Sequence, residues 1–243
     1  MIKKILSILV ALILTGYMVF SILFMSEGDN DRICQGVGIH IKDSLDISIV
    51  NSDMICDLLE SGDLQPQGKL LDAIDTKSME DLLLTHPLIA AAECYKTSGG
   101  EVKIIVRSKV PMVRVMNNRG EDYYVDSRGE LLTHRMLSVH LLVATGYIER
   151  SFASKELLDV VNAINKSDFW KAQIVQINVN RDRHIELVPR VGNHLLILGS
   201  ADDLENKLDR LFNFYGKGLD KIGWNKYRSV SVAYANQIVC KKR

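Results

Sequence analysis

An uninterrupted apolar run, Ile5 to Met25, constrains this chain more than any other feature of its sequence. The run follows Lys3 and Lys4 and contains no charged side chain. As a helix, its roughly 21 residues would span about 31 Å, which matches the hydrocarbon core of a bilayer. We therefore expect a single transmembrane helix over residues 5–25, preceded by a short tail over residues 1–4.

The flanks of the run predict its orientation. Two lysines precede it and three carboxylates follow it within residues 26–31, and this lysine bias keeps the N-terminus in the cytoplasm. A cleaved signal peptide is the alternative, but its apolar core is typically about 7–15 residues long and ends in a small-residue cleavage site. This run is longer and ends in Phe24-Met25-Ser26-Glu27, which offers no such site. Everything from about residue 26 onward is thus expected on the far side of the membrane.

The amino-acid composition disfavours nucleic acid as a partner, and the spacing of the cysteines disfavours a metal site. The chain carries 30 basic and 30 acidic side chains, so it lacks the excess positive charge typical of proteins that bind nucleic acid. Four cysteines, Cys34, Cys56, Cys94 and Cys240, show no metal-ligand spacing. An oxidising compartment would permit disulfides, but sequence cannot choose among the three possible pairings. Apolar neighbours of Cys56 and Cys94 favour buried thiols over a structural bridge.

A polar linker over residues 26–35 leads into a small α+β module over residues 36–110. Apolar alternation, capping residues and a glycine-containing turn define its elements. They are a strand (36–41), a short extended stretch (46–50), a helix after Asn51, a helix from Asp75 or Thr76 that ends before His86-Pro87, and a hairpin of strands 88–95 and 102–106. The expected order is therefore strand, helix, helix, strand, strand.

The remainder, residues 111–243, is expected to form a second, mainly-β module of α+β class with a late helix and a C-terminal edge strand. Short strands separated by turn residues dominate it. Its expected elements are strands at 112–116, 123–126, 131–132 and 141–144, a helix capped by Ser154, strands at 174–179, 184–188 and 195–198, a helix from Ser200 to Gly216, and a final strand, Ser229 to Tyr234.

No set of residues in the sequence supports catalysis or metal binding. The six histidines form no metal-ligand pattern, and no nucleophile or phosphate-loop motif is present. Asp126 and Glu130 bracket a turn, where an aspartate that bonds its own backbone is a better interpretation than an acid–base pair. Asn178, Asn180 and Asp182 lack the glutamate that closes a calcium loop. We expect no catalytic residue, metal, cofactor or small-molecule substrate.

Strand-rich modules without an active site can bind partners by adding a strand to an open sheet edge. The final strand, Ser229 to Tyr234, is the natural candidate because no later element is expected to cover it. Its face of Ser229, Ser231 and Ala233 is small and leaves room for a partner. The alternative is an interior strand, or one blunted by the basic tail. Proline at Ser231 or Val232 is expected to abolish partner binding without unfolding the chain.

Three stretches resemble one bacterial family, the cell-division FtsQ/DivIB proteins. They are His86-Pro87-Leu88-Ile89 with Ala92, Val106 to Val115 around Pro111, and Tyr124-Val125-Asp126-Ser127-Arg128-Gly129-Glu130-Leu131-Leu132. The first resembles the helix-to-strand junction of the family's POTRA domain, the second its linker and the third the V-D-x-x-G turn that opens its β domain. The order of anchor, POTRA domain and β domain agrees as well.

The resemblance implies a scaffold at the division septum, anchored once in the inner membrane with its bulk in the periplasm. Such a scaffold bridges early division proteins to an FtsB–FtsL pair and to components of septal peptidoglycan synthesis. The implied partner-binding residues are Tyr227, Ser229, Val230, Ser231, Val232, Ala233, Tyr234, Ala235, Asn236 and Gln237. A weaker recruitment site is implied on the POTRA strand that contains Ile104 and Val106.

Two other classes of protein compete with a division scaffold. A POTRA-bearing assembly factor for exported proteins would usually carry several POTRA repeats or a transmembrane barrel, and neither is visible in the sequence. An anchored cell-wall enzyme is disfavoured because the sequence offers no catalytic residues. Without the resemblance, the residues support an anchored, non-enzymatic binding protein.

Overall fold

The computed structural model describes residues 10–21, 32–42, 50–133, 141–219 and 223–243. These residues divide between two compact units, Met1–Ser108 and Lys109–Arg243, which are treated separately below. The predicted extended stretch at 46–50 lies outside the described residues except for Val50.

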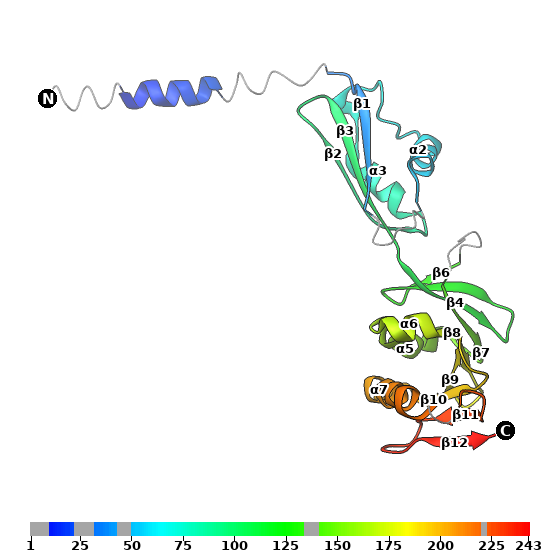
Figure 1. Cartoon of the computed structure of the whole chain (residues 1–243). Helices are drawn as coiled ribbons and strands as arrows, with labels where there is room; N and C mark the ends of the chain where they lie inside the picture. Colours follow the sequence, from blue (N-terminus) through cyan, green and yellow to red (C-terminus); the bar gives the residue numbers. More distant parts are fainter. Residues whose placement is uncertain (1–9, 22–31, 43–49, 134–140, 220–222) are drawn as a thin grey trace. The chain divides into compact units, whose positions relative to one another are not determined.

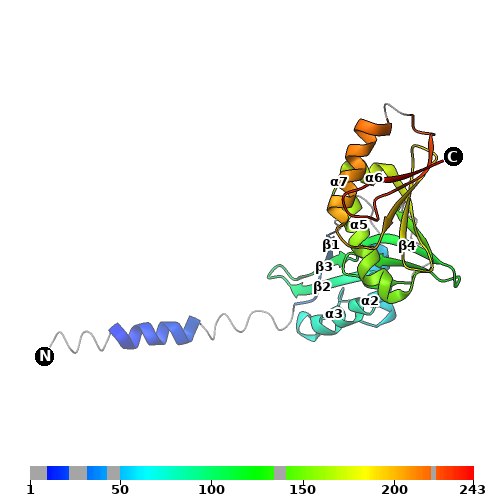
Figure 2. The ribbon, with the colours of Figure 1, turned by 90° about the horizontal axis from the view of Figure 1, so that it is seen from below.

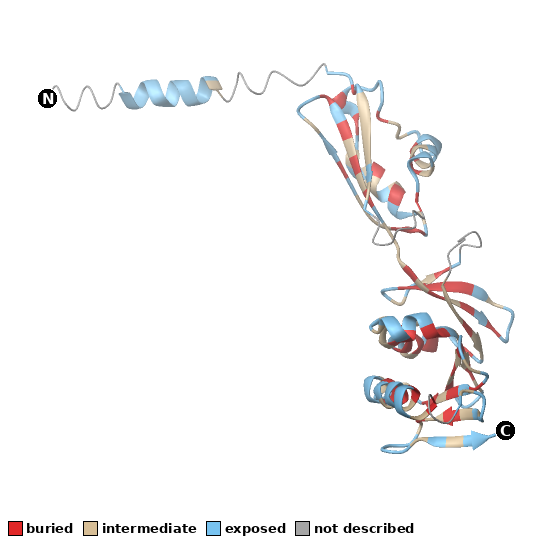
Figure 3. Ribbon diagram, in the orientation of Figure 1, coloured by how far each residue is buried: buried red, intermediate tan, exposed pale blue. Residues whose placement is uncertain are grey.

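Residues 10–21 form a helix whose apolar side chains are exposed along its whole length (Figure 3). They belong to the predicted membrane span, of which residues 5–9 and 22–25 lie outside the described part of the chain. Within the described residues, no helix is both long enough and apolar enough to cross a bilayer.

The first unit is a three-stranded sheet covered on one face by two helices (Figure 1). The order along the chain is the predicted one; the elements are β1 (Gly36–Ile41), α2 (Ser52–Ser61), a short 3₁₀ turn (Leu71–Ala73), α3 (Thr76–Leu84), β2 (Ile89–Lys96) and β3 (Glu101–Ser108). In the sheet the order is β1-β3-β2, with β1 parallel and β2 antiparallel to β3. β3, the last strand of this unit in sequence, is therefore the central strand of its sheet.

Local sequence explains the two helices of this unit. The Asn51 side chain accepts a hydrogen bond from the Met54 amide at 2.9 Å, and Asp75 caps α3 in the same way through Ser78. Their apolar stripes pack on the sheet, and Figure 2 shows both helices on the same side of it. The buried core contains Ile55, Leu59, Met79, Leu83, Val102, Ile104 and Val106.

The second unit is a nine-stranded sheet with its helices on one face (Figure 1). Its strands are β4 (Pro111–Asn117), β5 (Asp122–Asp126), β6 (Leu131–Leu132), β7 (Leu142–Gly146), β8 (Ile174–Val179), β9 (Ile185–Pro189), β10 (Leu195–Gly199), β11 (Tyr227–Ser231) and β12 (Val239–Lys242). The order in the sheet is β12-β11-β10-β9-β8-β7-β4-β5-β6. β7 pairs in parallel with β4 on one side and with β8 on the other, and so joins the antiparallel strands β4–β6 to the strands β8–β12.

The helices of this unit differ from the sequence-based expectation at their ends. The helix predicted from Ser154 begins one turn earlier, with α4 (Arg150–Phe152), a π turn (Ala153–Leu157) and α5 (Leu158–Asn165), so Ser154 lies inside it. A short helix, α6 (Asp168–Gln173), was not predicted and buries Trp170. The last helix, α7 (Leu204–Phe214), begins four residues after Ser200 and continues through a π turn (Tyr215–Leu219).

The four cysteines are free thiols in the structure. Cys94 is buried as predicted, whereas Cys56 is only half-buried on α2. Burial, with a smaller contribution from Glu80, raises the pKa of the Cys94 thiol to about 12. Since the thiolate is the nucleophile, a raised pKa leaves very little reactive Cys94 at neutral pH.

Alkylation should therefore distinguish these two cysteines. In the folded chain, iodoacetamide at neutral pH is expected to modify Cys56 and to leave Cys94 unmodified until denaturant is added. Peptide mass spectrometry after timed quenching measures both rates in one sample. Labelling of Cys94 as fast as Cys56 in the folded chain would contradict the packing of β2 against α3.

Candidate protein-binding edge

The C-terminal end of the nine-stranded sheet is a hairpin of β11 and β12. β11 pairs in parallel with β10 on one side and antiparallel with β12 on the other. β12 is the terminal strand, and within the described residues no strand lies on its outer side. The backbone edge that this end of the sheet offers to a partner is therefore that of Val239–Lys242.

The prediction that Ser229 to Tyr234 forms the open edge strand is wrong. Tyr227, Ser229, Val230 and Ser231 lie on β11, whose two backbone edges are both occupied. The strand ends at Ser231 because the chain turns and pairs back on itself. The sequence signal for β12 is short, three apolar residues (Ile238-Val239-Cys240) before the basic end, and it did not predict a separate strand.

The other predicted contact residues form the turn between the two strands. Their exposure differs sharply: Val232 is fully buried, whereas Tyr234 is 60% exposed. The Val232 amide donates to the Ile197 carbonyl at 2.9 Å, so proline at this position would disrupt the sheet as well as any interface. Ala233 is half-buried, and the exposed turn residues are Tyr234, Ala235, Asn236 and Gln237.

A left-handed residue and a close approach fix the path of this turn. Asn236 has φ of 58°, a conformation that asparagine tolerates better than most side chains. At the other end of the turn, Gly199 of β10 lies so close to Ala233 that a Cβ on Gly199 would approach the Ala233 Cβ to 2.8 Å. The turn is therefore seated on the end of β10 and projects residues 234–237 into solvent.

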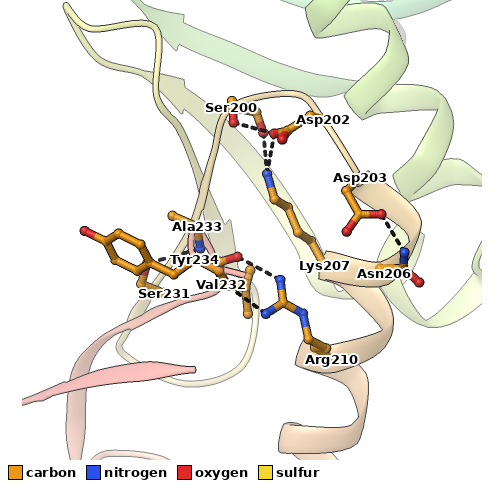
Figure 4. Close-up of polar contacts among 10 residues, drawn as sticks. All are labelled: Ser200, Asp202, Asp203, Asn206, Lys207, Arg210, Ser231, Val232, Ala233 and Tyr234. Carbon is orange, nitrogen blue, oxygen red and sulfur yellow. Dashed lines mark hydrogen bonds and ion pairs between the residues drawn. The ribbon is translucent and has the colours of Figure 1, made fainter. Parts of the chain in front are cut away.

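Arg210 of α7 clamps the turn from the helical side (Figure 4). Its guanidinium donates to the Val232 carbonyl at 3.0 Å, to the Tyr234 carbonyl at 2.8 Å and to the Gln237 carbonyl at 3.2 Å. Charge-assisted bonds from one planar fork are stronger than neutral ones and fix orientation. Arg210 thus orders most of the segment that leads into the open edge strand.

Lys207 lies one turn before Arg210 and anchors the beginning of α7. Its buried ammonium donates to the Ser200 carbonyl at 2.9 Å and to the Asp202 carboxylate at 2.7 Å (Figure 4). The bond from Lys207 lowers the pKa of Asp202 to about 2, and the Ser200 hydroxyl contributes to this shift. Lys207 therefore fixes the helix that carries Arg210 to the residues that directly follow β10.

Ile104 and Val106, the predicted recruitment residues of the first unit, do not lie on an edge. Both side chains are fully buried, and β3 is paired with β1 and β2. The prediction is wrong because β3, the last strand of this unit in sequence, is the central strand of its sheet. Within the described residues, the edge strands of this sheet are β1 and the eight-residue β2.

The residues weighed for catalysis have structural roles. The buried Asp126 carboxylate accepts hydrogen bonds from the Arg128 and Glu130 amides at 2.9 and 2.8 Å, as expected of a turn aspartate. Asn180 accepts in the same way from Asp182 and His184 in the β8–β9 turn. Among the described residues, no group of three His, Cys, Asp or Glu side chains is arranged to hold a metal ion.

Comparison with protein families identifies both units. Residues 110–241, more than half of the chain, match the family described as FtsQ/DivIB, C-terminal related. The chain belongs to this family. Residues 32–107 match the POTRA-like domain, in agreement with the fold of the first unit. The comparison with curated proteins found no match.

Membership confirms the resemblance drawn from the sequence motifs and implies a role in cell division for the chain. The α+β assignment, a POTRA-like domain followed by a mainly-β domain, is confirmed as well. FtsQ/DivIB proteins are in general membrane-anchored scaffolds without enzymatic activity.

Proposed function

We propose that this chain is a membrane-anchored, non-enzymatic scaffold of the division machinery that binds an FtsB–FtsL-type pair by strand addition to β12. Through that pair it would bridge early division proteins and the enzymes of septal peptidoglycan synthesis. The observation that carries the proposal is the open backbone edge of β12, which Arg210 and the turn hold in place.

Strand addition requires an edge whose donors and acceptors are ordered before the partner arrives. Main-chain hydrogen bonds then supply affinity, while neighbouring side chains supply specificity. The exposed residues 234–237 lie directly before β12 and are the proposed side-chain contacts, with Tyr234 the largest of them. Ser229 and Ser231 can contribute only their side chains to the interface, because the backbone of β11 is already paired on both sides.

The composition of β12 favours a different chain over a second copy of the same chain. Lys241 and Lys242 are exposed, and lysines on edge strands oppose pairing between identical edges. Antiparallel pairing of two β12 strands would bring like charges close together, which costs free energy. The edge of β12 can therefore pair with a strand of a different protein, whereas its lysines disfavour pairing with a second copy of this chain.

The proposed anchor is the run over residues 5–25, with residues 26–243 outside the cytoplasm. Support comes from the exposed apolar side chains of the helix at 10–21, of which Leu12, Ile13 and Leu14 are each more than 60% exposed. Such a surface needs an apolar environment. The corresponding domain boundaries are 36–110 for the POTRA domain and 111–243 for the β domain.

Pull-down with the full-length chain tests the proposal. The chain, solubilised in a neutral detergent, is expected to retain the FtsB–FtsL-type pair from the same cells in a salt-resistant complex. Zymography of the same sample against peptidoglycan should show no lysis. Failure to retain the pair, or a lytic band that copurifies with the chain, would contradict the scaffold function.

A further inference from the structure

A pocket of about 660 Å³ lies at the other end of the β10–β11–β12 strands, away from the turn held by Arg210. Four segments form it: the end of β9, the loop before β10, the beginning of β11 and the end of β12. The lining residues that matter below are Gly192, Asn193, His194, Arg228, Lys241 and Lys242.

The loop side of this pocket is rigidly built. Gln173, which is itself buried, donates from its side chain to the Val191 carbonyl at 3.0 Å and accepts from the Arg190 amide at 2.6 Å through its backbone carbonyl. The His194 ring is 4% exposed and its Nε2 lies 2.8 Å from the Tyr215 hydroxyl. The pocket therefore exists before any ligand binds.

Gly192 is required for this construction. Its φ is 92°, and a Cβ there would lie 2.4 Å from the His194 Cε1 atom. The loop can therefore close over the imidazole only with glycine at this position. The guanidinium of Arg243 donates to the Asn193 carbonyl and ties the end of the chain to the same loop.

The pocket is strongly positive. Among the described residues, its lining includes Arg228, Lys241, Lys242 and Arg243 and no acidic side chain. In the described part of the chain, Arg228, Lys241 and Lys242 form no ion pair. Burial lowers the pKa of His194, so its ring adds no charge at neutral pH and the field comes from the arginines and lysines.

We propose that this pocket binds a phosphate or diphosphate group. Several cations around one pocket, without an ion-pair partner among the described residues, attract a multiply charged anion more strongly than a single carboxylate. The planar fork of Arg228 suits tetrahedral oxyanions, which it can contact through two bonds at once. The volume falls in the range of small-ligand sites and exceeds what one acidic side chain would fill.

This site does not depend on the proposed scaffold function. It uses the side chains of β12 and the loop before β10, whereas strand addition uses the backbone edge of β12. The same chemistry is presented by a phospholipid headgroup and by a soluble phosphate or diphosphate compound.

Titration of the full-length chain with inorganic pyrophosphate tests the proposal without any partner protein. Calorimetry in neutral detergent at low salt (about 50 mM), where charges are least screened, is expected to show one saturable site. The double variant Arg228→Gln/Lys241→Gln should lose at least ~10-fold in affinity. Lys155→Gln removes an exposed lysine from the π turn Ala153–Leu157, which is not among the segments that form or hold this pocket, and should bind like the wild type.

Competition then assigns the source of the anion. Displacement of pyrophosphate by glycerophosphoglycerol, a lipid-free headgroup, would assign a lipid; resistance to it would assign a soluble phosphate compound. The proposal is overturned if pyrophosphate shows no saturable binding, or if Lys155→Gln weakens binding as much as the double variant. Binding of a hexaglutamate peptide in the absence of pyrophosphate binding would assign the pocket to an acidic protein segment instead.

Discussion

Replacing Lys242 by proline is expected to weaken binding of the FtsB–FtsL-type pair at least ~10-fold and to leave the fold intact. The backbone amide of Arg243 donates inward, to the Lys226 carbonyl at 3.4 Å. Because successive amides of a strand point in opposite directions, the Lys242 amide points toward the open edge. Proline removes that donor and places its ring where an added strand would lie.

Lys242→Ala separates the backbone from the side chain in this experiment. Alanine keeps the amide and removes the charge, so it should bind the pair much as the wild type does. Affinities measured by biolayer interferometry, with circular dichroism of each variant, provide the comparison. Equal affinity of the proline variant and the wild type would exclude β12 as the strand that receives the partner.

Arg210→Ala is expected to weaken binding of the same pair by about tenfold or more and to cost about 1–3 kcal/mol of folding free energy. Without the guanidinium, water can replace the bonds to Tyr234 and Gln237, but the carbonyl of the buried Val232 loses its donor. The turn then has to be ordered at the moment of binding. Fixing even one residue costs about 1–2 kcal/mol, enough to account for the tenfold loss.

Two variants on α7 control for non-specific damage to the helix. Asp209→Asn changes the exposed neighbour of Arg210 and should leave both affinity and stability unchanged. Arg210→Lys keeps the charge but lacks the fork, so it should fall between alanine and the wild type. If alanine and lysine variants bind like the wild type, Arg210 contributes to stability alone and does not position the edge.

The first unit was predictable because each of its signals is local. Asn51 and Asp75 cap their helices through their own side chains, and the turn at 97–100 contains the glycine that its positive φ requires. The sheet order was not predictable from such signals. Nothing in the residues of β3 indicates that β1, some 65 positions earlier, pairs beside it, and the recruitment site was misplaced for that reason.

The second unit was predicted less well where tertiary contacts override local preference. Ser154 is a good capping residue, yet it lies inside a helix that begins at Arg150 because Phe152 and Ala153 are needed in the core. Gly216 and Gly218 are typical helix terminators, but the helix continues past them as a π turn to Leu219, whose side chain is fully buried.

The proposed binding edge shows the same limit. The sequence predicts an edge strand at the end of the chain, and the sheet order confirms one there, but the predicted strand lies eight to ten residues before β12. A four-residue strand with two lysines carries almost no pattern of its own. Its partner strand β11 and the Arg210 clamp supply the order that local sequence lacks.

Hydrogen exchange on the full-length chain, alone and with the FtsB–FtsL-type pair, tests the central claim most directly. The Arg243 amide points inward, to the Lys226 carbonyl, so the alternating amides of Lys242 and Cys240 point toward the open edge. These two amides should therefore exchange quickly in the free chain. The partner is expected to slow exchange at these two positions, while β11, already paired on both sides, changes little. Protection confined to β6 or to the first unit, with β12 unchanged, would contradict it.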